Sequence, residues 1–121
     1  MKGRFSYPRS NRVADLIKEE VASLFIYSVN DPRLEGVISI TDVKVTDDLK
    51  VARIYYICPK GTDLGPVEKG LESVRGWVRR EISKKVNMRY TPEIEFKYDE
   101  VFENGMNMDE IFRKLKDGTD K

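Results

Sequence analysis

The chain has 121 residues, of which 36% are charged and 40% are hydrophobic, and its formal net charge is +1. It contains no histidine and a single cysteine, Cys58, which excludes imidazole catalysis, histidine-bearing zinc sites, clusters of cysteine ligands and an internal disulfide. No apolar run approaches the roughly 18 residues of a membrane span. We therefore expect one domain over residues 1–121, located in the cytoplasm and without a metal or cofactor.

The first predicted element is an amphipathic helix that begins near residue 10. Either Ser10 or Asn11 can cap its N-terminus, and apolar residues then recur at helical spacing as far as Phe25. Proline disfavours helical geometry in the residue before it, so the helix ends ahead of Asn30-Asp31-Pro32. We interpret Asp31-Pro32-Arg33 as a helix terminator with a local charge pair, and a partner contact is the alternative.

Two strands are predicted next, at residues 37–45 and 51–57, because both segments are rich in β-branched and aromatic residues. Thr46-Asp47-Asp48 supplies a turn, which makes the pair a hairpin. The apolar residues of the first strand change parity after Ile40. This change predicts a bulge near residues 41–42 or burial of both faces.

A second helix is predicted from Val67 to Val86, after a loop over residues 58–66. Its apolar residues recur every three or four positions, and the opposite face carries Lys69, Ser73, Gly76, Arg80 and Lys84. Gly76 costs about 1 kcal/mol relative to alanine in a helix interior. Lys85 falls on the apolar stripe of a straight helix, so we predict a kink near Gly76 that divides the helix in two.

A third strand is predicted at residues 94–99, where apolar and charged residues alternate. A short helix from Met108 to Leu115 and a polar tail at residues 116–121 complete the chain. A three-stranded sheet with one apolar face can be covered by the two long helices. The sequence therefore predicts a two-layer α+β domain.

Charge is segregated along the chain. Residues 1–12 and 66–90 each carry a net charge of +4, whereas residues 13–65 carry −3 and residues 91–121 carry −4. Two basic blocks of this kind can form one anion-binding face. We interpret residues 1–10 as a basic N-terminal arm that belongs to this face.

Four motifs connect the sequence to a known family. They are DPRL at 31–34, ITDVKVTDDLKVARIYY at 40–56, GWVRREI at 76–82 and RYTPEIEFKYD at 89–99. In these motifs the chain resembles the ribosome-binding factor A family over nearly its whole length. The resemblance implies a type II KH-like fold of order α-β-β-α-kink-α-β, with an Ala-x-Gly kink in place of a GxxG loop. Val74-Arg75-Gly76 stands at the kink, with valine where the family has alanine.

The resemblance implies a non-enzymatic RNA-binding factor that acts on the immature small ribosomal subunit. It further implies maturation of the 5′ end of the small-subunit rRNA and a requirement that grows in the cold. The expected partners are this rRNA and the free small subunit, a maturation GTPase is a further candidate, and we expect a monomer. The candidate RNA-binding residues are Lys2, Arg4, Arg9, Arg12, Lys69, Ser73, Arg75, Gly76, Arg79, Arg80, Lys84, Lys85 and Arg89.

Two other functions remain open at this point. The first is a protein–protein adaptor that uses the acidic C-terminal region to bind a basic partner. The second is a carboxylate enzyme that uses Asp47 and Asp48, although a turn explains both residues more simply. Tyr55, Tyr56 and Tyr90 could stack on RNA bases, but packing on the sheet is the preferred interpretation of Tyr55 and Tyr56.

Overall fold

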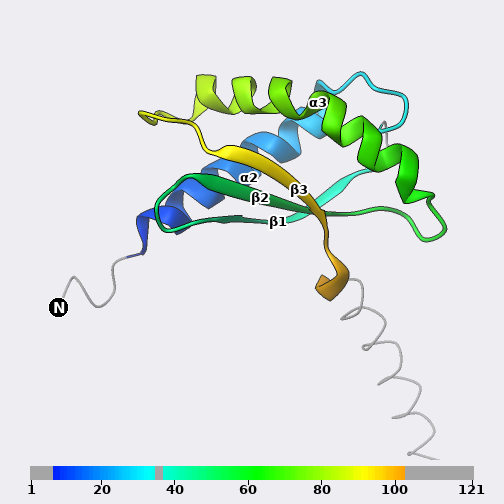
Figure 1. Cartoon of the computed structure of the whole chain (residues 1–121), viewed down its shortest axis with the longest axis horizontal. Coiled ribbons are helices and arrows are strands. Elements are labelled where there is room, and N and C mark those ends of the chain that lie inside the picture. Colours follow the sequence, from blue (N-terminus) through cyan, green and yellow to red (C-terminus); the bar gives the residue numbers. More distant parts are fainter. Residues whose placement is uncertain (1–6, 35–36, 103–121) are drawn as a thin grey trace, which may run out of the picture.

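The structure is a computed structural model, and it describes residues 7–34 and 37–102. Its elements, in chain order, are α2 (Arg9–Tyr27), β1 (Ser39–Val45), β2 (Val51–Ile57), α3 (Leu64–Lys85) and β3 (Glu93–Tyr98). The two helices pack on the same face of the sheet (Figure 1). The predicted α+β class and element order are confirmed, while the helix predicted at 108–115 and the tail at 116–121 lie outside the described residues.

The sheet has the strand order β1-β2-β3 and is mixed. β1 and β2 pair antiparallel, as the predicted hairpin requires, and β2 pairs parallel with β3. A parallel neighbour needs a crossover connection, and α3 provides it. The register shifts between Ile40 and Asp42, which confirms the predicted bulge.

The turn between β1 and β2 is held by its own side chains. Asp48 accepts hydrogen bonds from the Thr46 hydroxyl at 2.7 Å and from the Lys50 backbone N–H at 3.1 Å. Leu49 has a φ of 62°, in the left-handed region that non-glycine residues rarely adopt, and its side chain packs against the core. Asp48 therefore serves the turn, as the simpler interpretation of the sequence predicted.

The core lies between the helices and the sheet. From α3 it receives the predicted apolar stripe, of which Val67, Leu71, Val78 and Ile82 are buried, and Val86 is buried directly after the helix. Ile17 and Val21 of α2 and Ala52 and Ile54 of β2 are fully inaccessible to solvent. Each large aliphatic side chain contributes about 1.5–3 kcal/mol when fully buried, so this layer fixes which side of α3 faces solvent.

The start of α2 differs from the prediction. The N-cap is Pro8, whose φ of −54° suits a helix entry and whose side chain makes no cap hydrogen bond. The Pro8 carbonyl accepts from the N–H groups of Asn11 and Arg12 at 3.0 and 3.1 Å. Ser10, predicted as a cap, is buried within the helix, so the last two residues of the predicted arm, 9 and 10, are helical.

The predicted division of the second helix is wrong. α3 is one helix of 22 residues, capped by Asp63, whose side chain accepts from the Gly65 N–H at 3.1 Å. In Figure 1 its ribbon bends near the middle but keeps its helical turns. A single interior glycine destabilises a helix by about 1 kcal/mol. Burial of any one large apolar side chain of the stripe stabilises the fold by more than that. Lys85 is exposed at the last residue of the helix, so it needs no change of register.

Gly70, and not Gly76, is the glycine that packing requires in α3. A Cβ at Gly70 would lie 3.0 Å from the side chain of Leu34 and 3.3 Å from Cβ of Arg33, because the segment after α2 presses against α3 there. A Cβ at exposed Gly76 would meet only the Arg80 guanidinium, at an ordinary 3.6 Å.

We expect Gly70→Ala and Gly76→Ala to change stability in opposite directions. Gly70→Ala should lower the free energy of unfolding by about 1–3 kcal/mol, because the added methyl overpacks buried Leu34. Gly76→Ala should leave it unchanged or raise it by up to about 1 kcal/mol, because alanine favours the helix. Urea denaturation of both variants measures the difference. A destabilised Gly76→Ala variant would contradict this account of the two glycines.

Candidate nucleic-acid interface

The outer face of α3 carries most of the candidate residues. Lys69, Ser73, Gly76, Arg80 and Lys84 are all exposed there, as their helical spacing predicts. Lys85 is exposed at the C-terminal end of the same helix. At Gly76 the helix backbone is not covered by a side chain of its own, and the Arg80 guanidinium lies next to it.

Two cations of α3, Arg75 and Lys84, form short ion pairs along the helix. Arg75 pairs with Glu72 at 2.7 Å, and Lys84 pairs with Glu81 at 2.9 Å. Both pairs are exposed and so contribute little to stability, which leaves the cations available to stronger anions such as phosphates. Arg80 forms no ion pair with any residue that the structure describes.

Ser73 lies in a different environment, against the segment that follows α2. Asp31 and Arg33 form a bidentate pair with distances of 2.9 and 2.6 Å, as the local interpretation of the DPR sequence predicted. Arg33 also donates to the Ser73 hydroxyl at 3.2 Å, and that hydroxyl lies 3.3 Å from Asp31 Oδ2. The three side chains therefore join the segment after α2 to the middle of α3.

Arg33 also lowers the pKa of the Asp31 carboxyl group. The hydrogen bonds from its guanidinium, and then from its backbone N–H, hold the pKa of Asp31 well below its usual range. The carboxylate form is the one that these donors stabilise.

Arg79 is committed to the loop between α3 and β3. Its guanidinium donates to the Thr91 carbonyl at 2.8 Å and to the Pro92 carbonyl at 3.1 Å, and it lies 3.7 Å from Glu93. The guanidinium of Arg79 is thus partly occupied by partners within the protein. Arg79 positions the loop, whereas its neighbour Arg80 is exposed to solvent.

A second basic cluster lies where the hairpin turn meets the α3–β3 loop. Arg9, Lys50, Arg79 and Arg89 line a cavity of ≈ 480 Å³, whose lining also includes the acidic residues Asp48 and Glu93. We call this cavity the hairpin-end pocket. It brings together Arg9 from the first basic block and Arg89 from the second, as the charge pattern suggested. Lys50 could not be predicted at this site, because it stands alone in an acidic stretch and only the hairpin turn brings it here.

Arg12 does not line the hairpin-end pocket. It is exposed on α2, and its guanidinium donates to the Tyr7 carbonyl at 2.8 Å. Lys2 and Arg4 lie outside the described residues. All thirteen candidate residues stay predictions as RNA contacts. Among those that the structure describes, Arg12, Ser73 and Arg79 also bind other parts of the chain.

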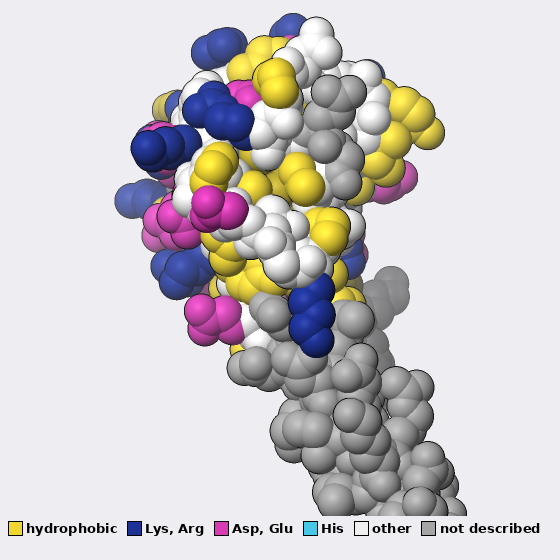
Figure 2. All heavy atoms as spheres, turned by 90° about the vertical axis from the view of Figure 1, so that its right-hand side faces the viewer, with side chains coloured by type: hydrophobic (Ala, Val, Ile, Leu, Met, Phe, Trp, Pro, Cys, Tyr) yellow, Lys and Arg dark blue, Asp and Glu magenta, His cyan; other side chains and the backbone are white. Residues whose placement is uncertain are grey.

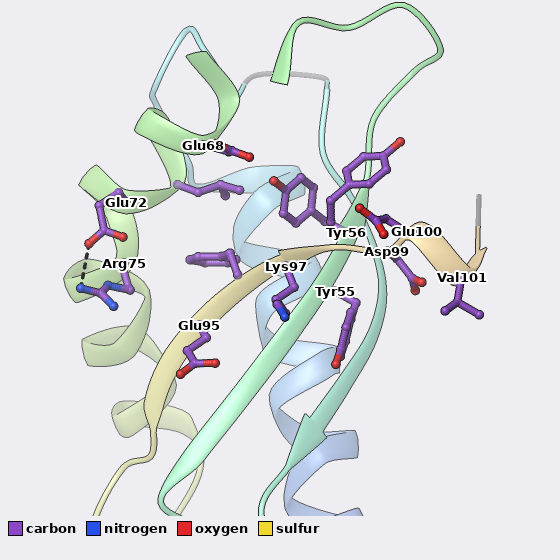
Figure 3. A pocket seen from close by; sticks show the side chains of 13 residues that line it. Tyr55, Tyr56, Glu68, Glu72, Arg75, Glu95, Lys97, Asp99, Glu100 and Val101 are labelled. Carbon is purple, nitrogen blue, oxygen red and sulfur yellow. Dashed lines mark ion pairs between the residues drawn. The ribbon is translucent and has the colours of Figure 1, made fainter. Parts of the chain in front are cut away.

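The opposite end of the sheet has the opposite charge. A groove of ≈ 740 Å³ between α3 and β3 is lined by Arg75, Lys97 and five carboxylates, from Glu68, Glu72, Glu95, Asp99 and Glu100 (Figure 3). Figure 2 shows cations and carboxylates intermingled along one side of the neighbouring face, with hydrophobic side chains over its middle. An extended anion therefore finds a favourable surface on α3 and at the hairpin end, and not here.

Two tyrosines of β2 border this acidic groove. Tyr56 is only 2% exposed and packs edge to face on Tyr98, with ring centroids 5.6 Å apart. Burial raises the pKa of Tyr56 to about 12. Tyr55 is half-buried and lies beneath Lys44, whose Nζ is 5.6 Å from the ring centroid. Both side chains therefore pack on the sheet, as predicted.

Within residues 7–34 and 37–102, no group of histidine, cysteine or acidic side chains could hold a metal ion. The helices of that same part of the chain include none that is long and apolar enough to cross a membrane.

The fold places the chain in the type II KH-like class, because a hairpin is followed by a crossover helix and a parallel third strand. The family model for ribosome-binding factor A matches residues 9–112. Ribosome-binding factor A of Clostridioides difficile (strain 630) is 40% identical over 112 residues, which cover 93% of this chain and 88% of that protein. The chain belongs to the ribosome-binding factor A family.

Further relatives agree with this assignment. Ribosome-binding factor A of Desulfatibacillum aliphaticivorans is 41% identical over 91% of this chain and 89% of its own length. The crystal structure of ribosome-binding factor A from Thermus thermophilus matches with a TM-score of 0.66 at 19% identity, over 74% of this chain and 93% of that chain. A Thermus thermophilus homology model fitted into a cryo-EM map of a 30S complex matches with a TM-score of 0.62 at 20% identity, over the same shares. The two structural matches support the fold.

The Asp31–Arg33 pair predicts a pH-dependent stability. Because the folded protein holds the pKa of Asp31 low, its contribution is present above the unfolded pKa of about 3.9 and is lost as pH falls through the folded pKa. Asp31→Asn should therefore lower the melting temperature at pH 7, and the gap to the native protein should close in acid. Asp47→Asn, which alters an exposed carboxylate of the turn, is the control. A gap that stays constant with pH would contradict the role of this pair.

Because Arg79 binds two backbone carbonyls, we expect its replacement to destabilise the protein, whereas replacement of Arg80 should not. Arg79→Ala should lower the free energy of unfolding by about 1–3 kcal/mol, because two hydrogen bonds from a charged donor are lost. Arg80→Ala should change it by less than about 0.5 kcal/mol, since the side chain is exposed. Thermal and urea denaturation of both variants provide the comparison. Equal stabilities would show that Arg79 does not hold the loop.

Proposed function

We propose that this chain binds the small ribosomal subunit through its rRNA and acts as an assembly factor, not as an enzyme. The observation that carries the proposal is the exposed basic face of α3 in a member of the ribosome-binding factor A family. A relative with this fold has been placed in a 30S complex. The proposal includes action on the immature, free subunit in the cytoplasm, late maturation of the 5′ end of its rRNA, and a monomeric protein. A maturation GTPase is a candidate partner.

The chemistry of the face suits a phosphate backbone. Arg80 and Lys69 have no ion pair among the described residues, while Lys84, and Arg75 at the border with the acidic groove, can exchange a carboxylate for a phosphate. Gly76 leaves the surface low between them, so an RNA strand can approach the helix closely. The core beneath holds these groups in fixed positions. Contacts of this kind set the position of the RNA and carry no information about its bases.

The acidic groove supports a second candidate function. Its five carboxylates against two cations would suit a basic protein segment, and three of them, Glu95, Asp99 and Glu100, belong to the acidic C-terminal region of the adaptor hypothesis. The two functions differ in one measurable property. Binding through the α3 face to naked rRNA depends steeply on salt, whereas an adaptor needs no binding to naked rRNA at all.

The main prediction concerns Arg80 and Lys84. Replacing both with alanine should weaken binding to the small subunit and flatten the slope of log K against log salt by ~1–2 units, since each lost phosphate contact removes about 0.7–0.9. The melting temperature should barely change, because both side chains are exposed. We would measure subunit and rRNA affinity at several salt concentrations.

The matched control is the double substitution Lys44→Ala and Lys97→Ala. It also removes two exposed positive charges, but from strands β1 and β3 and not from α3. This variant should keep the native salt slope. If the two double variants lose the same slope, net charge and not the α3 face governs binding. If the α3 variant remains folded with a native slope, the proposed face is wrong and the adaptor function leads.

A further inference from the structure

The hairpin-end pocket contains an aromatic side chain that the basic face of α3 lacks. Tyr90 lines it and is 74% exposed, so its ring contributes little to the core. The Arg89 guanidinium lies over the ring, 5.5 Å from its centroid. An exposed aromatic ring beside an arginine is the arrangement on which proteins stack single-stranded nucleic-acid bases.

The charges around Tyr90 suit phosphate. Arg9 and Lys50 line the same pocket from the start of α2 and from the hairpin turn, and neither forms an ion pair with a described residue. The two acidic residues of the lining have partners within or next to the pocket. Asp48 binds Thr46 and the Lys50 backbone, and Glu93 lies beside Arg79. The lining has four cations, from Arg9, Lys50, Arg79 and Arg89, and two carboxylates, so the net charge at the pocket is positive.

The loop that carries Tyr90 is held in place from below. Arg79 donates to the carbonyls of the next two residues, Thr91 and Pro92, and Pro92 is buried. Met88, just before Arg89, packs partly against the core. The backbone on both sides of Tyr90 is thus held in place, so little backbone freedom is lost when a ligand stacks on the ring.

The size of the pocket agrees with a small ligand. Its volume is ≈ 480 Å³, within the range of about 300–1,000 Å³ of small-molecule sites. Leu49 and Met88 supply an apolar part of its lining, and the cations lie around it. A nucleotide combines the same two properties, because a flat apolar base is joined to a charged phosphate.

We propose that the hairpin-end pocket binds one unpaired nucleotide of the RNA, with its base stacked on Tyr90 and its phosphates beside Arg9 and Lys50. This inference rests on the proposed function, since RNA is the ligand. It adds a preference for single-stranded RNA next to the phosphate-binding face of α3. A paired base in a helix cannot reach the ring, so duplex RNA should not use the pocket.

The test uses the full chain and a single-stranded RNA oligonucleotide with 2-aminopurine at one position, whose fluorescence reports stacking. The same strand in a duplex is the second probe. Three variants are compared with the native protein: Tyr90→Ala, Tyr90→Phe and Tyr27→Ala. Tyr27 is 82% exposed at the opposite end of α2, so Tyr27→Ala is the matched control. Melting temperatures verify that each variant is folded.

Tyr90→Ala should weaken binding of the single strand by about 5- to 150-fold and reduce the fluorescence change, as removal of a stacking ring does. Tyr90→Phe keeps the ring and should bind like the native protein, and so should Tyr27→Ala. Duplex affinity should be the same in all variants.

Three outcomes would overturn the inference. One is native single-strand binding by Tyr90→Ala, and another is an equal loss for single strand and duplex. The third is a loss of subunit binding without a loss of single-strand binding, which would assign the pocket to a ribosomal protein. The Arg80 and Lys84 double variant separates the two proposals. If it loses subunit affinity while Tyr90→Ala does not, the proposed function stands and the pocket inference fails.

Discussion

The structure depends on the apolar layer between the sheet and its two helices. Ile54 of β2, Ile17 of α2 and Val78 and Ile82 of α3 are inaccessible to solvent, and they meet in one cluster. Because that layer occupies one side of α3, the residues half a turn away must face water. The positions of Gly76, Arg80 and Lys84 on the surface are therefore consequences of core packing.

The same architecture separates charge in space. The parallel pairing places Val51 beside Glu93 at one end of the sheet and Tyr56 beside Tyr98 at the other. The hairpin turn and the α3–β3 loop meet at the first end and bring cations from several segments together. The acidic residues of α3 and β3 line the groove at the second end. A protein with a net charge of +1 thus presents a basic pole and an acidic pole, and each suits a different kind of partner.

Patterns within single elements allowed much of this to be predicted. The apolar spacing of α3, the hairpin and its bulge all follow from periodicity, and the family resemblance followed from contiguous motifs. The errors concern competition between effects. Glycine at position 76 does not break α3, because the buried stripe outweighs its helix cost. Pro8 starts α2 although Ser10 has the better capping side chain.

Contacts between distant segments could not be predicted from spacing. Gly70 is required because Leu34 lies against it, and nothing in the local sequence announces that contact. Ser73 fits the outer face of α3 by helical position, yet its hydroxyl lies within hydrogen-bonding distance of Asp31 and Arg33. Lys50 joins Arg9 and Arg89 only because the hairpin folds toward the end of α3. The roles of these residues depend on contacts between segments that are far apart in the sequence. Such contacts cannot be read from the spacing of residues in one sequence.

The parallel β2–β3 pairing also has a consequence for the order of folding. The β1–β2 hairpin joins neighbouring segments, whereas β3 can pair with β2 only after the whole of α3 has been closed into a crossover. Closing the longer loop costs more chain entropy, which favours the hairpin as the earlier event. During synthesis β3 is also the last of these strands to leave the ribosome. The residues of the basic face of α3 all lie within one helix, whereas the pocket around Tyr90 is complete only when the final strand has docked beside β2.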